Sequence, residues 1–303
     1  MAISKMILLL PCLLSGALVA TASPVSSASS HSSSYAVGHD HASSYPNRTI
    51  AGVTIIDTPV VRAAQTYARE HTSDFVYNHV MRGWLFGALI WQHQQEGGNN
   101  GTRTNTTTPV NNAPEDFDVE VHAVAALLHD LGWDRTPHSP LISPDRRFEV
   151  DGAIASREFL QHYHGNNGSS DEDHHHLGAG TPLPPQKPWD HRRTQLVWDS
   201  IALHTTDTIF PYKEPEVRVV GQGIWMDFSG PALGVTEGEY AAVVAQFPRA
   251  GFREGVNETL TWLCASKPQT TYDTFMQPFG EHYLANYSAK GHQAFDIIQN
   301  ASD

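Results

Sequence analysis

The stretch Val121–Asp134, "VHAVAALLHDLGWD", decides the fold of this chain. Its apolar residues follow helical spacing, and the adjacent residues His129 and Asp130 stand where that helix stops. Neighbouring residues within a helix do not face each other, but at a helix end the backbone can relax. An imidazole nitrogen and a carboxylate oxygen can then bind one Zn²⁺, Fe²⁺ or Mn²⁺ ion. The alternative interpretation is that His129 offsets the helix dipole.

Helical patterns extend outward from this stretch in both directions. Thr58 and Pro59 predict a helix start, with a capping residue followed by proline at the first helical position. Gly132 predicts the end of the helix that carries His129, since glycine suits the left-handed position there. The helix that follows Asp74 is apolar around most of its circumference, so we expect it to be buried. The predicted helical segments are residues 58–70, 74–94, 114–130, 146–163, 190–206, 215–230, 236–247, 257–265 and 271–284.

These segments predict an all-α bundle in one domain, residues 58–303. No alternating strands joined by a hairpin turn stand out in the sequence. Residues 23–57 are rich in serine and histidine and are expected to form a disordered leader. Two polar stretches, at about 96–116 and 164–190, are expected to be loops.

The charge and the first residues limit the partners and the location. The formal net charge is −13 at pH 7, and nucleic acid is not an expected partner because phosphate binding needs a basic face. Residues 1–22 have the pattern of a secretory signal peptide, with an apolar run too short to cross a membrane. We therefore expect a secreted protein without membrane association, and Asn-x-Ser/Thr sequons predict a glycoprotein. Cys264 is expected to be a buried helix residue rather than a nucleophile.

Two further metal-suited residues lie in apolar helical segments. His79 stands in the middle of the buried segment 74–94, where an imidazole needs a partner, and a metal ion is one. Arg82 follows three residues later on the same face. Asp227 lies in another apolar segment, where an unpaired carboxylate would be costly. The four candidate ligands are therefore His79, His129, Asp130 and Asp227.

Six motifs in order resemble one known family. "YNHVMR", "ALLHDLG", "RFEVDGA", "ALHTT", "GQGIWMDFSG" and "SKPQTTYDTFMQPFGEHYLANY" occur between about Thr58 and Tyr287. They are similar to the successive motifs of the fungal cyanamide hydratase-like branch of the HD superfamily of metal-dependent hydrolases. The resemblance implies an all-α HD fold and one divalent metal, zinc, held by the four candidate ligands; iron is the alternative. It also implies hydration of a small carbon–nitrogen triple bond, as in cyanamide to urea.

The segment "RFEVDGA" favours one metal ion over two. Two-metal members of this superfamily place a further histidine shortly before its Gly-Ala pair, whereas this chain has Phe148 and Glu149 there. Phe148 cannot bridge to a second ion. His204 remains a candidate for a second-metal ligand, but His204 and Glu149 alone would give a second ion too few protein ligands.

Several residues near the candidate ligands are candidates for chemistry and for substrate binding. Hydration of a carbon–nitrogen bond leaves charge on nitrogen, which needs a proton. The candidate donors are Glu149 first, His204 second and Asp151. For Glu149 the alternative is a carboxylate in the first turn of a helix, favoured by the dipole. The candidate substrate pocket is formed by Trp133, Trp225 and Arg82, with Phe228 beside them; Arg82 could instead pair with an acidic residue, and the aromatic residues could be plain core.

The sequence leaves several functions open. A hydratase of a cyanamide, nitrile or isonitrile group is favoured, acting on a small-molecule substrate. Phosphohydrolysis needs cationic groups around the phosphate, yet no lysine follows the His129-Asp130 pair, and Arg146 and Arg147 are the only basic pair nearby. Other metal-dependent hydrolysis, a silent binding protein and an iron oxygenase are the remaining alternatives. The sequence does not indicate an oligomeric state.

Overall fold

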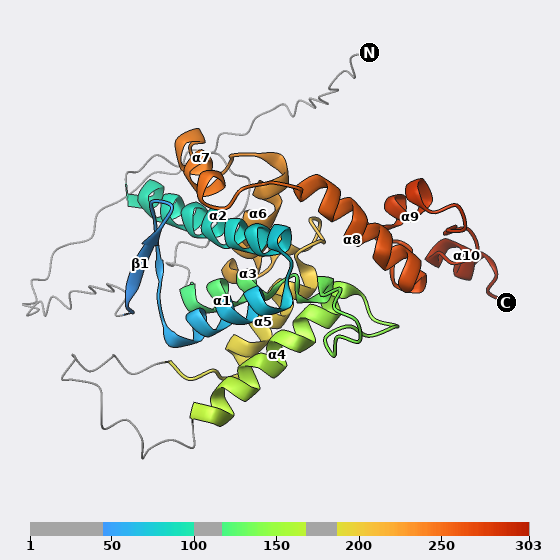
Figure 1. Cartoon of the computed structure of the whole chain (residues 1–303), viewed down its shortest axis with the longest axis horizontal. Coiled ribbons are helices and arrows are strands. Elements are labelled where there is room, and N and C mark those ends of the chain that lie inside the picture. The colour runs from blue at the N-terminus through green and yellow to red at the C-terminus, as the bar shows by residue number, and fades with distance from the viewer. Residues whose placement is uncertain (1–44, 100–116, 168–186, 303) are drawn as a thin grey trace, which may run out of the picture. The chain divides into compact units, whose positions relative to one another are not determined.

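The described part of the chain is a helical bundle with one small hairpin. The computed structural model describes residues 45–99, 117–167 and 187–302, which belong to one compact unit, Ser43–Asp303. The strands are β1 (Asn47–Ile50) and β2 (Val53–Ile56), and the α-helices are α1 (Pro59–His71), α2 (Asp74–Asn99), α3 (Val119–Leu128), α4 (Phe148–Asn167), α5 (His191–Leu203), α6 (Pro215–Ser229), α7 (Glu237–Gln246), α8 (Phe252–Ser266), α9 (Gln277–Tyr283) and α10 (Ala294–Gln299). Short 3₁₀ turns are η1 (Leu131–Trp133), η2 (Phe210–Tyr212) and η3 (Pro268–Thr270). The predicted all-α fold is confirmed (Figure 1).

Some predicted features lie outside the described residues. These are the signal peptide at 1–22, residues 23–44 of the leader, and most of the two polar loops. The described parts of the loops show that α2 and α4 continue to Asn99 and Asn167, a few residues past the points where loops were expected to begin. Among the described helices, none combines the length and the apolar character that a membrane crossing requires.

The end of the predicted leader is an ordered hairpin, so that prediction was wrong for residues 47–57. β1 and β2 pair antiparallel, and Asn47 faces Ile56 in the register. Ala51 and Gly52 both have positive φ, which gives the tight turn between the strands. Val53 and Ile55 are buried against the bundle. Four-residue strands without an Asn-Gly turn gave too little alternation to be recognised in the sequence.

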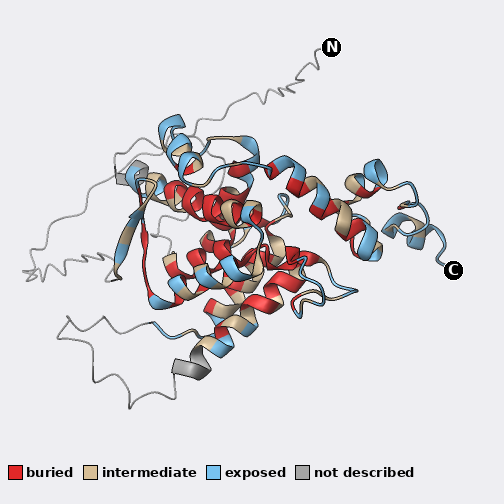
Figure 2. Cartoon of the chain, viewed as in Figure 1, coloured by how far each residue is buried: buried red, intermediate tan, exposed pale blue. Residues whose placement is uncertain are grey.

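The helix α2 supplies much of the core, as its apolar pattern predicted. Figure 2 shows buried residues along the middle of α2 and on the first half of α4, whereas α9 and α10 are mostly exposed. The side chains of Val80, Trp84 and Phe86 are buried in α2, as is Cys264 in α8. The start of α1 at Pro59 also agrees with the prediction, but its N-cap residue makes no capping hydrogen bond.

The helices α2 and α6 approach each other through glycines. Of the helix pairs in the described part, α2 and α6 share the most extensive contact. A Cβ atom added to Gly223 of α6 would lie 2.4 Å from the carbonyl oxygen of Gly83 and 2.7 Å from the backbone nitrogen of Gly87. A side chain at residue 223 would therefore push the two backbones apart. This close approach brings residues of α2 within hydrogen-bonding distance of α6.

The structure explains why residue 132 is a glycine, and the reason differs from the predicted left-handed backbone. Its φ is not positive, and α3 ends at Leu128, before the 3₁₀ turn η1. A Cβ atom on Gly132 would lie 2.0 Å from the carbonyl oxygen of Phe148. The residue is therefore small because the start of α4 packs directly on the turn after His129, not because the backbone is left-handed.

We predict that Gly132→Ala destabilises the protein by about 1–3 kcal/mol or more, because backbone atoms of α4 must move to admit the methyl group. Gly238→Ala is the matched control, since a Cβ there meets nothing closer than 4.0 Å and alanine favours the helix α7. Urea denaturation would measure both free energies of unfolding. An unchanged midpoint for Gly132→Ala would contradict the packing argument.

The buried histidine His122 of α3 makes stability depend on pH. Its Nε2 atom is buried without a hydrogen-bond partner in the described part of the chain, and burial lowers its pKa to about 3. The unfolded chain has an ordinary imidazole pKa of about 6.5. Between these values the unfolded state holds one more proton, so the folded state loses stability as the pH falls.

We predict that His122→Leu flattens this dependence. Between pH 6 and pH 4 the free energy of unfolding of the natural chain should fall more steeply than that of the variant, by up to about 1.4 kcal/mol per pH unit. Denaturant titrations at half-unit pH steps would measure the two slopes. Parallel slopes would show that His122 is not held neutral in the folded state.

Candidate metal centre

A buried ion pair joins α2 to α6 at the point of their close approach. Nε and Nη2 of Arg82 donate to Oδ1 and Oδ2 of Asp227, both at 2.7 Å. Nη1 of Arg82 donates to the carbonyl oxygens of Phe247 and Pro248 at 3.0 and 3.1 Å. Arg82 thus pairs with an acidic residue, which is the alternative that the sequence left open, and all three of its side-chain nitrogens donate to protein acceptors.

His79 completes this interaction from one turn earlier in α2. Its Nδ1 lies 2.7 Å from Oδ2 of Asp227, and all three side chains are buried. Burial by itself would raise the pKa of Asp227, but the hydrogen bonds from His79 and Arg82 lower it to about 2. Because the carboxylate is ionised and can only accept, Nδ1 of His79 carries the hydrogen of this bond, and Nε2 is the ring atom left to bind a metal ion.

His129 and Asp130 converge as their position at a helix end predicted. His129 is the C-cap residue of α3, and Asp130 leaves the helix with φ −103° and ψ 20°. Nδ1 of His129 donates to the carbonyl oxygen of Ala126 at 2.9 Å, and Nε2 lies 3.2 Å from Oδ2 of Asp130. The imidazole therefore uses one nitrogen to satisfy the helix end and presents the other beside the carboxylate.

A third imidazole faces the same carboxylate. His204 follows α5, and its Nδ1 donates to the carbonyl oxygen of Ile201 at 2.6 Å. Its Nε2 lies 3.8 Å from Oδ1 of Asp130, and Nε2 of His79 lies 3.7 Å from Oδ2. Three imidazole Nε2 atoms from α2, α3 and α5 thus surround one buried carboxylate. Burial and the neighbouring His129 lower the pKa of His204 to about 4.

Three of these residues can hold a metal ion. Ligand atoms of His79, His129 and Asp130 lie within 4.8 Å of one another, and all three residues are buried. Nε2 of His129 and both carboxylate oxygens of Asp130 have no hydrogen-bond partner within the described residues. Orphaned buried atoms are costly unless a ligand completes them, and this nitrogen–oxygen donor set suits a divalent cation.

The charge state of the pair reflects mutual stabilisation. Burial by itself would lower the pKa of His129, but the adjacent Asp130 carboxylate raises it. Burial likewise would raise the pKa of Asp130, and the His129 imidazole lowers it. A cation bound between them would replace the proton on His129, so metal binding competes with protonation.

Asp227, also predicted as a direct ligand, lies outside the group of converging ligand atoms in the described residues. Its two oxygens accept hydrogen bonds from Arg82, and Oδ2 also accepts from Nδ1 of His79. It therefore stands behind His79, where a carboxylate fixes the ring orientation and the tautomer. The sequence could not separate these roles, because both require a buried carboxylate in an apolar helix.

The three predicted proton donors lie in different surroundings. His204 faces Asp130 directly, as described above. Glu149 is also buried, but its partners are other residues. It accepts a hydrogen bond from Oγ1 of Thr205 at 2.6 Å and forms an ion pair with Arg147. Asp151 instead pairs with Lys267 at 2.7 Å and with Arg146.

Asp151 therefore does not join the converging residues in this structure. Its carboxylate ties the start of α4 to the end of α8, which is a structural role. The sequence placed it in a shared motif with Glu149, but two residues along a helix point to different sides.

Aromatic side chains surround the histidines. Trp133 stacks on His79 with ring centroids 6.3 Å apart, and it is buried. Nε1 of Trp225 donates to the carbonyl oxygen of His204 at 3.2 Å, and its ring is 38% exposed. Phe252 at the start of α8 was not predicted, although its ring lies 5.2 Å from that of His79. No motif covered its segment, so the sequence offered no signal for it.

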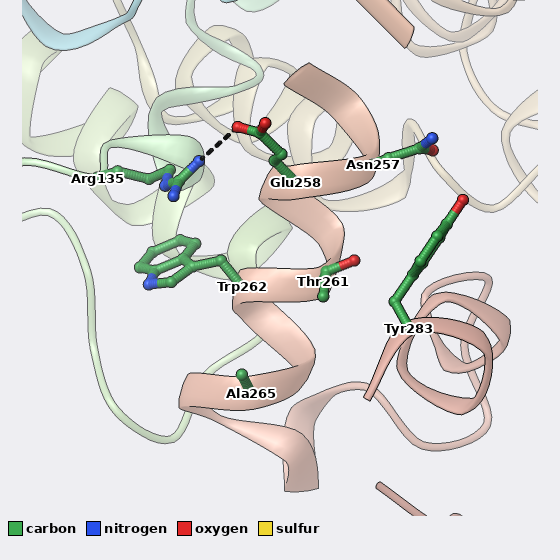
Figure 3. A pocket seen from close by; sticks show the side chains of 7 residues that line it. All are labelled: Arg135, Asn257, Glu258, Thr261, Trp262, Ala265 and Tyr283. Carbon is green, nitrogen blue, oxygen red and sulfur yellow. Dashed lines mark ion pairs between the residues drawn. The ribbon is translucent and has the colours of Figure 1, made fainter. Parts of the chain in front are cut away.

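Two surface cavities lie outside the group of candidate metal ligands. One, of about 430 Å³, is lined by Arg135, Trp262 and Tyr283 among others, and an ion pair joins Arg135 to Glu258 there (Figure 3). The other, of about 550 Å³, reaches Trp133 from the side of the α1–α2 turn. Neither is lined by the candidate metal ligands, so we assign no catalytic role to these cavities.

The arrangement can be compared with known proteins. Residues 76–216 match the HD domain family. The match begins in α2 and ends in the first turn of α6, so the matched segment includes His79, His129, Asp130 and His204 but not Asp227. HD domains are generally metal-dependent hydrolases, and the match therefore supports an enzyme of that kind. No curated protein matches the chain.

We predict that metal binding distinguishes the candidate ligands in the matched segment from the residues that support them. His129→Ala and Asp130→Asn should each abolish stoichiometric binding, because each removes a donor atom from a buried set. Asp227→Asn should weaken binding by about 10–100-fold without abolishing it, since it loosens the orientation of His79. Elemental analysis after dialysis and a competition titration would measure both effects.

The exposed His282 provides the matched control, and His282→Ala should keep full metal content. Full metal content in Asp130→Asn would show that the site lies elsewhere. Complete loss in Asp227→Asn, with the fold intact by circular dichroism, would return Asp227 to the direct ligands.

Proposed function

We propose that this protein is a metal-dependent hydro-lyase that adds water to a small carbon–nitrogen triple bond of a cyanamide, nitrile or isonitrile. The products are then a urea, an amide or a formamide. The observation that carries the proposal is the pairing of the cations near the metal centre. Arg82 and Arg249 face Asp227, and Arg147 faces Glu149. A centre whose nearest cations are already neutralised favours an uncharged substrate over a phosphate ester.

The donor set suits one divalent ion, and we propose zinc, with iron as the alternative. When bound, such an ion polarises the substrate and lowers the pKa of a water molecule, which makes a nucleophile available near neutral pH. The protein residues supply orientation around it. Asp227 holds His79, the Ala126 carbonyl holds His129, and both keep Nε2 directed at the centre.

His204 is the residue best placed to move a proton during the reaction. Its Nδ1 hydrogen is committed to the Ile201 carbonyl, so Nε2 is the atom that accepts and returns a proton beside Asp130. Glu149 and Thr205 lie next to it and support the charge that develops there. This reverses the order expected from sequence, in which Glu149 came first.

We also propose that the protein is secreted and acts on a small molecule, as its first residues and its charge suggest. The segment that carries this proposal lies outside the described residues. Immunodetection in the culture medium of an expressing cell would test it, and retention of the full chain inside the cell would overturn it.

We predict that the zinc-loaded protein converts cyanamide to urea or a nitrile to its amide and leaves p-nitrophenyl phosphate intact. His204→Asn should lower kcat by about 10²–10⁴-fold, the usual contribution of a positioned acid–base group, while metal content stays stoichiometric. Product would be quantified by mass spectrometry with ¹⁸O-labelled water. His282→Ala is the control variant. Turnover of the phosphate ester without any hydration would overturn the proposal in favour of phosphohydrolysis.

A further inference from the structure

Three large aromatic side chains near the metal centre are only partly buried. Trp225 and Phe228 lie on α6 and are 38% and 45% exposed, and Phe275, before α9, is 38% exposed. The ring centroids of Trp225 and Phe228 lie 6.2 Å apart. We call these three residues the aromatic rim. Exposed aromatic rings that lie near a buried site are candidates for a ligand-binding surface.

Each side chain of the aromatic rim contacts the centre directly or through one neighbour. The ring of Phe228 lies 5.3 Å from that of His79, and Trp225 is hydrogen-bonded to the backbone of His204. Phe275 reaches His204 through the buried Phe148, with ring centroids 6.3 Å and 5.6 Å apart. The aromatic rim is therefore exposed to solvent on one side and is linked by these contacts to His79 and His204.

The chemistry of the rim is apolar and rigid. The hydrogen bond from Nε1 of Trp225 to the His204 carbonyl holds the indole in place, so its exposed part is ring carbon. Phe228 also packs on Phe252, with ring centroids 5.2 Å apart. The nearby cation Arg249 lies over the ring of Phe252 and beside Asp227, so its charge is already satisfied. Preset aromatic surface of this kind favours a flat apolar group.

Resting on the proposed function, we propose that the rim selects substrates in which the carbon–nitrogen triple bond carries an aryl group. The ring of the substrate stacks among Trp225, Phe228 and Phe275, and its carbon–nitrogen end reaches the metal centre. Substrates with the same reacting group but no ring lose this contact. The rim thus determines specificity, whereas the imidazoles and Asp130 perform the chemistry.

The test compares benzonitrile with acetonitrile in the zinc-loaded full chain. We expect kcat/KM to be at least about tenfold higher for benzonitrile, the effect of one good aromatic contact, with the difference in KM. Phe275→Ala and Phe228→Leu should each reduce this preference to about threefold or less. Phe295→Ala, which removes a 67% exposed ring on α10, should keep it.

Binding gives a readout that does not depend on turnover. Saturation-transfer NMR should detect benzonitrile on the natural chain and on Phe295→Ala, and lose most of the signal on Phe275→Ala. If nothing is hydrated but this binding pattern holds, the rim stands and the proposed function fails. Equal efficiency for both nitriles, or benzonitrile binding that the rim variants leave unchanged, would overturn the inference.

Discussion

The buried ion pair between Arg82 and Asp227 is the interaction on which the rest of the centre depends. A charged pair inside a helical core is tolerated only with good geometry, and here two parallel hydrogen bonds of 2.7 Å provide it. The glycine contact between α2 and α6 makes this distance reachable, because a side chain at residue 223 would separate the helices. Removal of one partner would leave the other charge buried, at a cost of about 3–5 kcal/mol. Stability and ligand orientation are therefore coupled.

The three imidazoles around Asp130 are held in the same way, each by a hydrogen bond from Nδ1. Each of His79, His129 and His204 donates its Nδ1 hydrogen to an acceptor that cannot move far, a carboxylate or the carbonyl of a preceding turn. The orientation of each ring is thereby fixed before any ion binds. Preorganisation of this kind reduces the cost of assembling a metal centre, because few side-chain rotations remain to be frozen.

Sequence reasoning recovered the features that depend on local pattern. The helices of the bundle, the burial of α2 and Cys264, and the convergence of His129 with Asp130 all follow from spacing and helix ends. Features that depend on contacts between distant segments were missed or assigned a different role. Gly132 is required by the carbonyl of Phe148, and Asp227 is drawn behind His79 by Arg82. The hairpin at residues 47–56 escaped because its strands are short and gain stability from the bundle beneath them.

Asp227 lies beyond the end of the HD match, so residues 76–216 do not contain all of the side chains that support the candidate metal centre. A fragment that stops at residue 216 would retain every atom of the converging donor set and yet lose the clamp on one imidazole. The ring of His79 would then lose the hydrogen bond that orients its Nδ1, and Arg82 would lack its counter-ion. The hydrogen-bonded support of the candidate metal centre therefore extends into α6 as far as Asp227, beyond the end of the family match at residue 216.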